Sequence, residues 1–161
     1  MHILADATMP LVTELTEHLA QLLAPHGQQV QLTTFVGRQP TAAQLADAEF
    51  MLIRSITRVD SDLLKQAPKL RWVGTATIGT EHVDAQACAA AGVTFVSTPG
   101  VNAAAVGDYV AAAVCQLALA QGELPAGEVA IVGAGHTGRA AGQRLQGLGL
   151  QVHYYDPPLV Q

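Results

Sequence analysis

The sequence predicts an α/β fold built on parallel β-sheets, and three observations support this. Apolar runs of strand length alternate with segments of helical periodicity along most of the chain, as parallel sheets with crossover helices require. Half of the 161 residues are apolar and 13% are charged, so the chain can bury a sizeable core. A glycine-rich loop joins an apolar strand to a helix near residue 135, as in the opening βαβ unit of a Rossmann domain.

The first half of the chain is expected to contain five strands joined by helices. The expected strands cover 2–5, 30–35, 50–53, 72–73 and 93–96, and the longer helices cover 11–23 and 83–91. Thr41 can cap a short helix that ends at Ala46. Another short helix starts at Asp60 or Ser61 and ends before Pro68.

A hinge-like break at 97–100 divides the chain into two expected domains, 1–98 and 99–161. Asn102 is expected to cap a long helix over 103–119, which a linker at 121–127 follows. Because Gly107 and Asp108 interrupt the apolar run 103–120, the run favours a buried helix over a membrane span. The last segment predicts a strand at 128–132, a helix at 137–148 and a strand at 151–155.

Composition and charge argue against several function classes. The formal net charge is −5 and no Lys/Arg cluster occurs, which argues against nucleic-acid and membrane-surface partners. The opening segment MHILADATMP lacks the basic and long apolar regions of a signal peptide. Cys88 and Cys115 have neither metal-ligand nor disulfide spacing, so we expect buried thiols, no metal site and a reducing cytoplasmic setting.

The glycine loop carries the strongest local signal for a ligand. Gly133 permits the tight turn from strand to helix, Gly135 lets the backbone approach a pyrophosphate, and Gly138 allows close packing of the helix on the strand. His136 and Thr137 lie in the first turn of that helix, where free N–H groups and the helix dipole favour phosphates. The loop therefore predicts a dinucleotide site.

Asp156 sharpens the identity of the expected cofactor. It follows the next strand, 18 residues after Gly138, where a carboxylate can accept hydrogen bonds from ribose hydroxyls. Because a carboxylate repels a 2′-phosphate, NAD is favoured over NADP. Arg139 either reaches a phosphate or remains a solvated helix residue, and the His136 side chain is expected at the solvent or the cofactor edge rather than in catalysis.

Two polar loops upstream predict a second site. The segment Arg54-Ser55-Ile56-Thr57 follows one strand, and the segment 74–80, with its glycines and threonines, follows the next. Ligands of open α/β sheets bind at the edge formed by such strand ends. Backbone N–H groups and hydroxyls in these loops suit a carboxylate or a phosphate.

Several short motifs resemble the D-isomer-specific 2-hydroxyacid dehydrogenase family. The matching motifs are Pro68-Lys69-Leu70, His82-Val83-Asp84, Ala91-Gly92-Val93, Pro99-Gly100 and Asn102. The phrases GTATIGTEHVD and YYDPP are most similar to a branch of the family that oxidises a phosphorylated hydroxy acid in pyridoxal phosphate synthesis. The resemblance runs over all 161 residues. Asp108 stands where the wider family usually has Glu, which leaves the local packing of the linking helix open.

The resemblance implies a flavodoxin-like substrate domain at 1–98, then a linking helix and an incomplete NAD-binding Rossmann domain at 99–161. It implies that Ser55 and Thr77 contact a small phosphorylated hydroxy acid; ordinary turn and capping roles are the alternative. It also implies that Asp156 binds NAD. His82 and Asp84 match the family pattern, although their place at a helix start favours a structural role.

The family's catalytic Arg, Glu and His lie downstream of the first βαβ unit, so no catalytic residue is assigned to this chain. We therefore expect the chain alone to be inactive and to bind NAD weakly, and the resemblance implies a homodimer for the full-length form. Two alternatives remain open. One is another dehydrogenase of the family, such as one acting on phosphoglycerate, and the other is a non-catalytic ligand-binding fragment.

Overall fold

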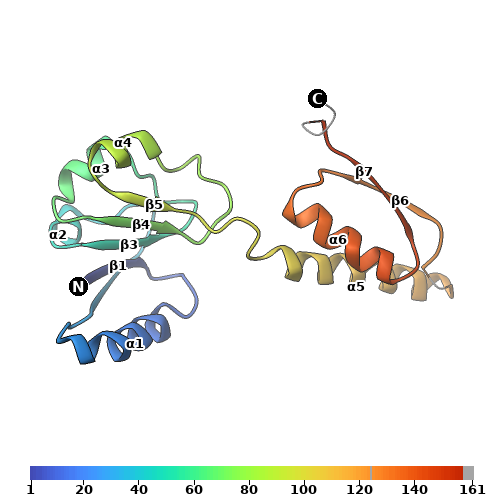
Figure 1. The fold of residues 1–161 in the computed structure, drawn as a ribbon, viewed down its shortest axis with the longest axis horizontal. Coiled ribbons are helices and arrows are strands. Elements are labelled where there is room, and N and C mark those ends of the chain that lie inside the picture. Colours follow the sequence, from blue (N-terminus) through green and yellow to red (C-terminus); the bar gives the residue numbers. More distant parts are fainter. Residues whose placement is uncertain (124, 158–161) are drawn as a thin grey trace. The chain divides into compact units, whose positions relative to one another are not determined.

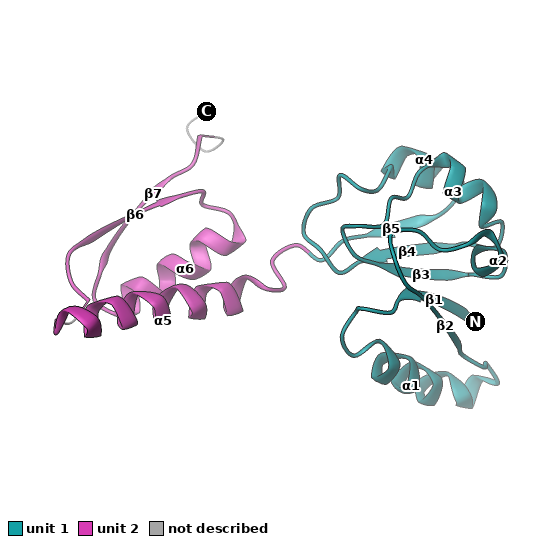
Figure 2. Ribbon diagram, turned by 180° about the vertical axis from the view of Figure 1, so that it is seen from behind, with its two compact units in different colours: residues 1–98 teal, residues 99–161 magenta. Residues whose placement is uncertain are grey.

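The computed structural model describes residues 1–123 and 125–157, and it shows the predicted α/β fold in two units, Met1–Thr98 and Pro99–Gln161 (Figure 2). Pro158 of the YYDPP motif lies outside the described residues. Each unit contains a parallel sheet: five strands in the first unit and two in the second. The fold class predicted from the sequence is confirmed.

The sheet of the first unit has the strand order β2-β1-β3-β4-β5, and all its pairs are parallel. Its strands are β1 (His2–Asp6), β2 (Gln31–Phe35), β3 (Phe50–Ile53), β4 (Trp72–Thr75) and β5 (Thr94–Val96). Its helices are α1 (Val12–Leu23), the short η1 (Ala24–His26), α2 (Ala42–Leu45), α3 (Ser61–Gln66) and α4 (Ala85–Ala90). All five expected strands form, with β4 two residues longer than expected.

The core lies on the face of the sheet that α2, α3 and α4 cover (Figure 1). Leu45, Leu63 and Cys88 from these helices pack with Met51 and Val73 from the strands, and all five are buried. Burial of aliphatic side chains of this size is the main source of stability for such a unit. The first unit therefore has a hydrophobic core of its own.

The other face of the sheet carries α1 alone (Figure 1), and the packing there is open. Leucines at positions 15, 19 and 23 of α1 border an apolar groove of about 280 Å³. Phe50, Leu52 and Trp72 of the sheet line its other side. The helical spacing of these leucines predicts the helix correctly, but Leu15 remains 44% exposed.

Local capping explains where three of the helices begin. Thr41 and Gln44 form a capping box at α2, as expected for Thr41. The Asp60 carboxylate accepts hydrogen bonds from the N–H groups of Asp62 and Leu63, so Asp60 rather than Ser61 caps α3. Asp84 likewise caps α4, and α4 therefore starts later than the expected residue 83.

The second unit contains the long helix α5 (Ala103–Gln121), then β6 (Glu128–Val132), α6 (His136–Gly147) and β7 (Gln151–Tyr155). Helix α6 lies between α5 and the β6–β7 pair (Figure 1). The expected cap at Asn102 is wrong, since its side chain makes no capping hydrogen bond. Its backbone is helical (φ −91°, ψ 0°), whereas a capping side chain needs an extended backbone.

Helix α5 forms over the expected range without a break, but the expectation that it is buried is wrong. Gly107 lets α6 approach, because a Cβ there would lie 2.9 Å from the Ala140 carbonyl, and Asp108 pairs with Arg144 at 2.6 Å. Only 11% of the most apolar 18-residue stretch of α5 is buried. Cys115, on this helix, is accordingly half-buried rather than buried, whereas Cys88 is buried as expected.

Of the helices in the described part of the chain, α5 is the one whose length and composition would allow it to cross a membrane. An 18-residue window of it has a mean hydropathy of 1.6. Core helices of soluble proteins pass the same test. The two-stranded sheet of the second unit is also largely uncovered, since Val132 and Tyr155 are strongly exposed.

Candidate functional site

The glycine loop of the second unit has the geometry that its sequence predicts. Gly133 has φ +99°, a left-handed conformation that favours glycine at the strand end. At Gly138, a Cβ would overlap the carbonyl oxygen of Gly133, so only glycine allows the helix to approach the loop this closely. At Gly135, by contrast, no described residue beyond its chain neighbours has an atom within 4 Å of the position a Cβ would take. The loop is therefore packed closely against α6 at Gly138, whereas space remains for a ligand at Gly135.

The N-terminus of α6 is available to an anion. Gly135 is its N-cap residue and supplies no side-chain cap, and no acidic residue lies in the first turn. The N–H groups of the first turn, which includes His136 and Thr137, therefore lack a side-chain partner at the cap and carry the positive end of the helix dipole. The His136 ring packs against Gly100, where a Cβ would lie 2.9 Å from the imidazole Cγ.

Asp156 is tied to the glycine loop. Its Oδ2 accepts a hydrogen bond from the backbone N–H of Ala134 at 2.7 Å. The Gly133 N–H donates to the Tyr155 carbonyl at 2.8 Å, so the end of β7 and the loop after β6 are joined twice. Within the described residues, Oδ1 of Asp156 accepts no hydrogen bond and can face a ligand.

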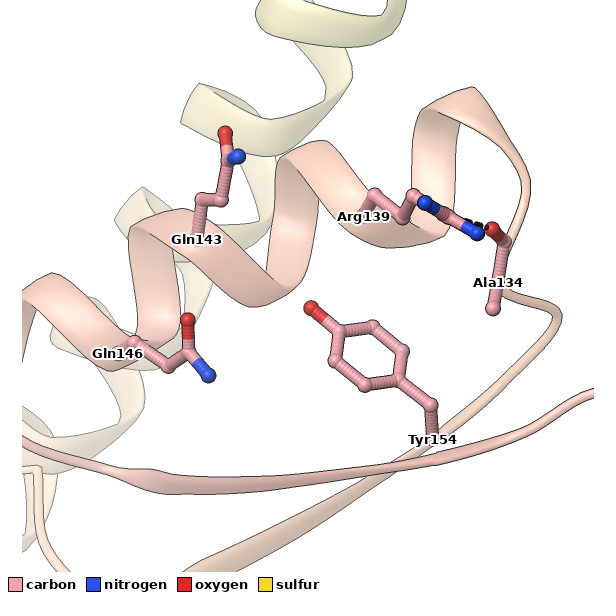
Figure 3. A pocket seen from close by; sticks show the side chains of 5 residues that line it. All are labelled: Ala134, Arg139, Gln143, Gln146 and Tyr154. Atoms are coloured by element: carbon pink, nitrogen blue, oxygen red, sulfur yellow. Dashed lines mark hydrogen bonds between the residues drawn. The ribbon is translucent and has the colours of Figure 1, made fainter.

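A pocket of about 430 Å³ lies beside the loop, between α6 and β7 (Figure 3). It is lined by Ala134, Arg139, Gln143, Gln146 and Tyr154. Arg139 folds back on the loop, because its Nε donates to the Ala134 carbonyl at 2.6 Å, so it is not the freely solvated residue that was one expectation. Tyr154 fits against α6 because Gly142 has no Cβ; a Cβ at that position would overlap the Tyr154 hydroxyl. Sequence reasoning missed this cavity, since nothing in the local sequence pairs β7 with α6.

In the first unit, Ser55 and Thr77 lie at the same edge of the sheet. Strands β3 and β4 pair with Ile53 opposite Thr75, and each of the two candidate residues follows two positions later. Ser55 is exposed and Thr77 is half-buried. The structure therefore places both predicted residues where the carboxyl ends of neighbouring strands meet.

Thr77 belongs to a hydrogen-bonded chain of side chains. Its Oγ1 donates to the Gly79 carbonyl at 3.1 Å and lies 2.7 Å from the Oγ1 of Thr75. The Thr75 hydroxyl in turn lies 3.0 Å from Nε2 of His82. Burial lowers the pKa of His82 below its ordinary value, with partial opposition from Glu81, so the imidazole is neutral at pH 7.

A buried carboxylate at the end of β1, that of Asp6, holds the guanidinium of Arg54 at this edge. Asp6 is 1% exposed, and its Oδ1 accepts from the N–H of Thr8 at 2.8 Å and from its hydroxyl at 2.6 Å. Its Oδ2 holds the Nε of Arg54 at 3.3 Å. Burial alone would raise the pKa of Asp6, but the hydrogen bonds from Thr8 and the charge and hydrogen bond of Arg54 together lower it. Asp6 is therefore ionised and fixes Arg54 next to Ser55.

One buried hydroxyl at this edge has no hydrogen-bond partner in the described residues. The Oγ1 of Thr57 is fully buried and has no hydrogen-bond partner among residues 1–123 and 125–157. No three His, Cys, Asp or Glu side chains in those residues are grouped to hold a metal ion. The edge thus offers hydroxyls, N–H groups and one guanidinium, a set that suits an oxyanion such as a carboxylate or phosphate.

Comparison with known protein families and sequences gives a consistent result. The sequence profile of the D-isomer specific 2-hydroxyacid dehydrogenase catalytic domain matches residues 5–147. An erythronate-4-phosphate dehydrogenase from Idiomarina loihiensis is 49% identical over 161 residues and 99% of this chain. One from Aeromonas salmonicida is 42% identical over 98% of the chain. The chain spans about 40% of the length of these two curated relatives.

Solved structures of similar fold cover nearly the whole chain. The 3-phosphoglycerate dehydrogenase of Entamoeba histolytica, solved with NAD+, has a TM-score of 0.73 at 21% identity, and the match covers 98% of this chain and 54% of that one. The D-lactate dehydrogenase of Escherichia coli has a TM-score of 0.71 at 16% identity, covering 98% and 56%. At these identities the likeness supports the fold.

Proposed function

Because the chain belongs to the D-isomer-specific 2-hydroxyacid dehydrogenase family, we propose that it forms the N-terminal part of an NAD-dependent erythronate-4-phosphate dehydrogenase. The reaction oxidises the 2-hydroxyl of 4-phospho-D-erythronate to the 2-oxo acid, a step in pyridoxal phosphate synthesis. The observation that carries this proposal is the 49% identity to a relative of that name over 99% of the chain.

The cofactor assignment is supported by the fit of the second unit to a dinucleotide. The open space at Gly135 and the first-turn N–H groups at His136 and Thr137 would hold the pyrophosphate, with Gly133 and Gly138 keeping the loop in shape. The free oxygen of Asp156 would accept from the adenosine ribose and exclude a 2′-phosphate. When bound, NAD supplies the hydride acceptor of the reaction.

The substrate assignment is supported by the polar edge of the first unit. Ser55 and Thr77 are proposed to donate hydrogen bonds to the phosphorylated substrate, and Arg54 supplies a positive charge beside them. All three residues come from the loops that follow β3 and β4. This division of work assigns the substrate to residues 1–98 and the cofactor to residues 99–161.

The acid/base residues of the family are proposed to lie outside this chain, so the chain alone should not turn over. We use the term completed protein for this chain extended at its C-terminus by the further segments that its relatives have. We propose that the completed protein is a cytoplasmic enzyme and assembles as a homodimer. We also propose that its further segments cover the face of α5 that is exposed in this chain.

The test is NADH formation from 4-phosphoerythronate by the 161-residue chain and by the completed protein. We expect activity only from the completed protein. Turnover by the 161-residue chain would contradict the assignment of the catalytic residues. Absence of turnover by a folded completed protein that binds NAD would contradict the proposed function.

A further inference from the structure

The hydrogen-bonded chain at the edge of β4 has a definite direction. Thr77 has one hydroxyl proton, and the Gly79 carbonyl, which can only accept, takes it. The Thr75 hydroxyl, 2.7 Å away, must then donate its own proton to Thr77. Because the Thr75 proton is used in this way, its oxygen accepts from His82, and Nε2 of His82 carries the hydrogen.

This direction determines what Thr77 can bind. An oxyanion has no proton to give, so the Thr77 hydroxyl can bind it only by donating, while the Thr77 oxygen continues to accept from Thr75. It would move its proton from the Gly79 carbonyl to an oxyanion, which competes well because hydrogen bonds to charged acceptors are stronger. We propose that His82 is a positioning residue that, through Thr75, fixes the Thr77 hydroxyl as a donor to an oxyanion of the substrate.

The fold holds His82 in place for this role. Its carbonyl accepts from the Val59 N–H at 2.8 Å, and the Val59 carbonyl accepts from the Asp84 N–H at 2.8 Å. Thr75 is 2% exposed, so water does not replace its partners. The inference rests on the proposed substrate role of Thr77, and it deepens that role by naming the two residues that set the hydroxyl's direction.

The first experiment measures the tautomer of His82 in the 161-residue chain, by long-range ¹H–¹⁵N NMR of the imidazole nitrogens at pH 7.5. The inference requires hydrogen on Nε2 and a bare Nδ1. Hydrogen on Nδ1 would reverse the chain and overturn the inference, and this result does not depend on any variant or ligand.

The second experiment titrates the same chain with inorganic phosphate and with 4-phosphoerythronate while following the Thr77 amide. His82→Leu removes the donor, and His82→Gln keeps an N–H at a similar reach. We expect His82→Leu to weaken phosphate binding about fivefold and His82→Gln to recover most of that loss. Equal losses in the two folded variants, or no loss in either, would overturn the inference.

The two experiments separate the inference from the proposed function. If neither anion perturbs Thr77 in the wild-type chain, the substrate role of Thr77 fails and the inference falls with it, whatever the tautomer. If the anions bind at Thr77 but Nδ1 carries the hydrogen, the substrate role stands and the inference alone is overturned. Thr75→Val serves as an independent variant, since it breaks the same chain without changing His82, and it should reproduce the loss seen with His82→Leu.

Discussion

The carboxylate of Asp6 and the guanidinium of Arg54, 48 positions apart in the sequence, meet at 3.3 Å where β1 and β3 end. The carboxylate is almost completely buried, whereas the guanidinium remains partly exposed. A buried carboxylate that points one nitrogen of a cation inwards leaves the remaining donors of that cation for a ligand. This relationship fixes the orientation of the Arg54 guanidinium at the edge.

Asp6→Asn should destabilise the chain by about 2 kcal/mol at pH 7, because it leaves Arg54 and the Thr8 donors with a weaker acceptor. Urea unfolding followed by circular dichroism measures this. The matched control is Asp62→Asn, which removes an exposed carboxylate paired with Lys65 and should leave the free energy of unfolding nearly unchanged.

Asp6→Asn should also reduce the loss of unfolding free energy that the chain shows as the pH falls below about 5. The pKa of Asp6 is lower in the folded chain than its ordinary value near 3.8. Its contribution is therefore complete above the unfolded pKa and disappears as the pH falls through the folded pKa. Between pH 5 and about pH 2 the wild-type chain should lose more stability than Asp6→Asn. Parallel curves for the two proteins would contradict an ionised Asp6.

Two glycines of the loop should separate folding from cofactor binding. Gly138→Ala places a Cβ on the Gly133 carbonyl and should cost at least about 2 kcal/mol of stability. Gly135→Ala meets no protein atom, so it should fold normally yet lower NAD affinity of the completed protein on the order of tenfold. Calorimetry measures both quantities. Gly147→Ala, in α6 away from the loop, is the control and should change neither adversely.

Asp156→Asn should reduce the preference for NAD over NADP by about tenfold in the completed protein. The amide oxygen can still accept from the Ala134 N–H, so the loop keeps its shape while the charge that repels a 2′-phosphate is lost. Isothermal titration with both cofactors gives the ratio, and Asp108→Asn controls for a general change of charge. An unchanged ratio would show that Asp156 does not face the ribose.

Thr57→Val should stabilise the chain by about 1 kcal/mol, because it replaces a buried hydroxyl without a partner in the described residues by a methyl group of the same shape. Thermal unfolding measures the effect. A loss of stability would mean that the Thr57 hydroxyl is hydrogen-bonded in solution.

Features carried by local sequence were predicted well. The glycine loop, the strands 50–53, 128–132 and 151–155, and the helix cap at Thr41 depend on neighbouring residues, and each forms where the sequence places it. The pair Asp6–Arg54 and the chain from His82 to Thr77 were not predicted. They depend on the order of strands in the sheet and on how a loop folds back, which spacing along the chain does not specify.

The errors at α5, Cys115 and Asn102 have two separate causes. Burial of α5 and of Cys115 was inferred from apolar composition, but burial needs a partner surface, and in the described residues α5 packs mainly against α6. The cap at Asn102 failed because the preceding turn, in which the Ala103 N–H donates to the Gly100 carbonyl, sets a helical backbone at that residue.

The central claim is that residues 1–161 provide the substrate edge and the NAD loop of an erythronate-4-phosphate dehydrogenase. The most direct measurement is the kcat/KM of the completed protein with NAD for 4-phosphoerythronate and for 3-phosphoglycerate. We predict that 4-phosphoerythronate is preferred by at least about a hundredfold, as expected where polar groups of the site are left unpaired by the wrong substrate. Equal values, or a preference for 3-phosphoglycerate, would contradict the claim.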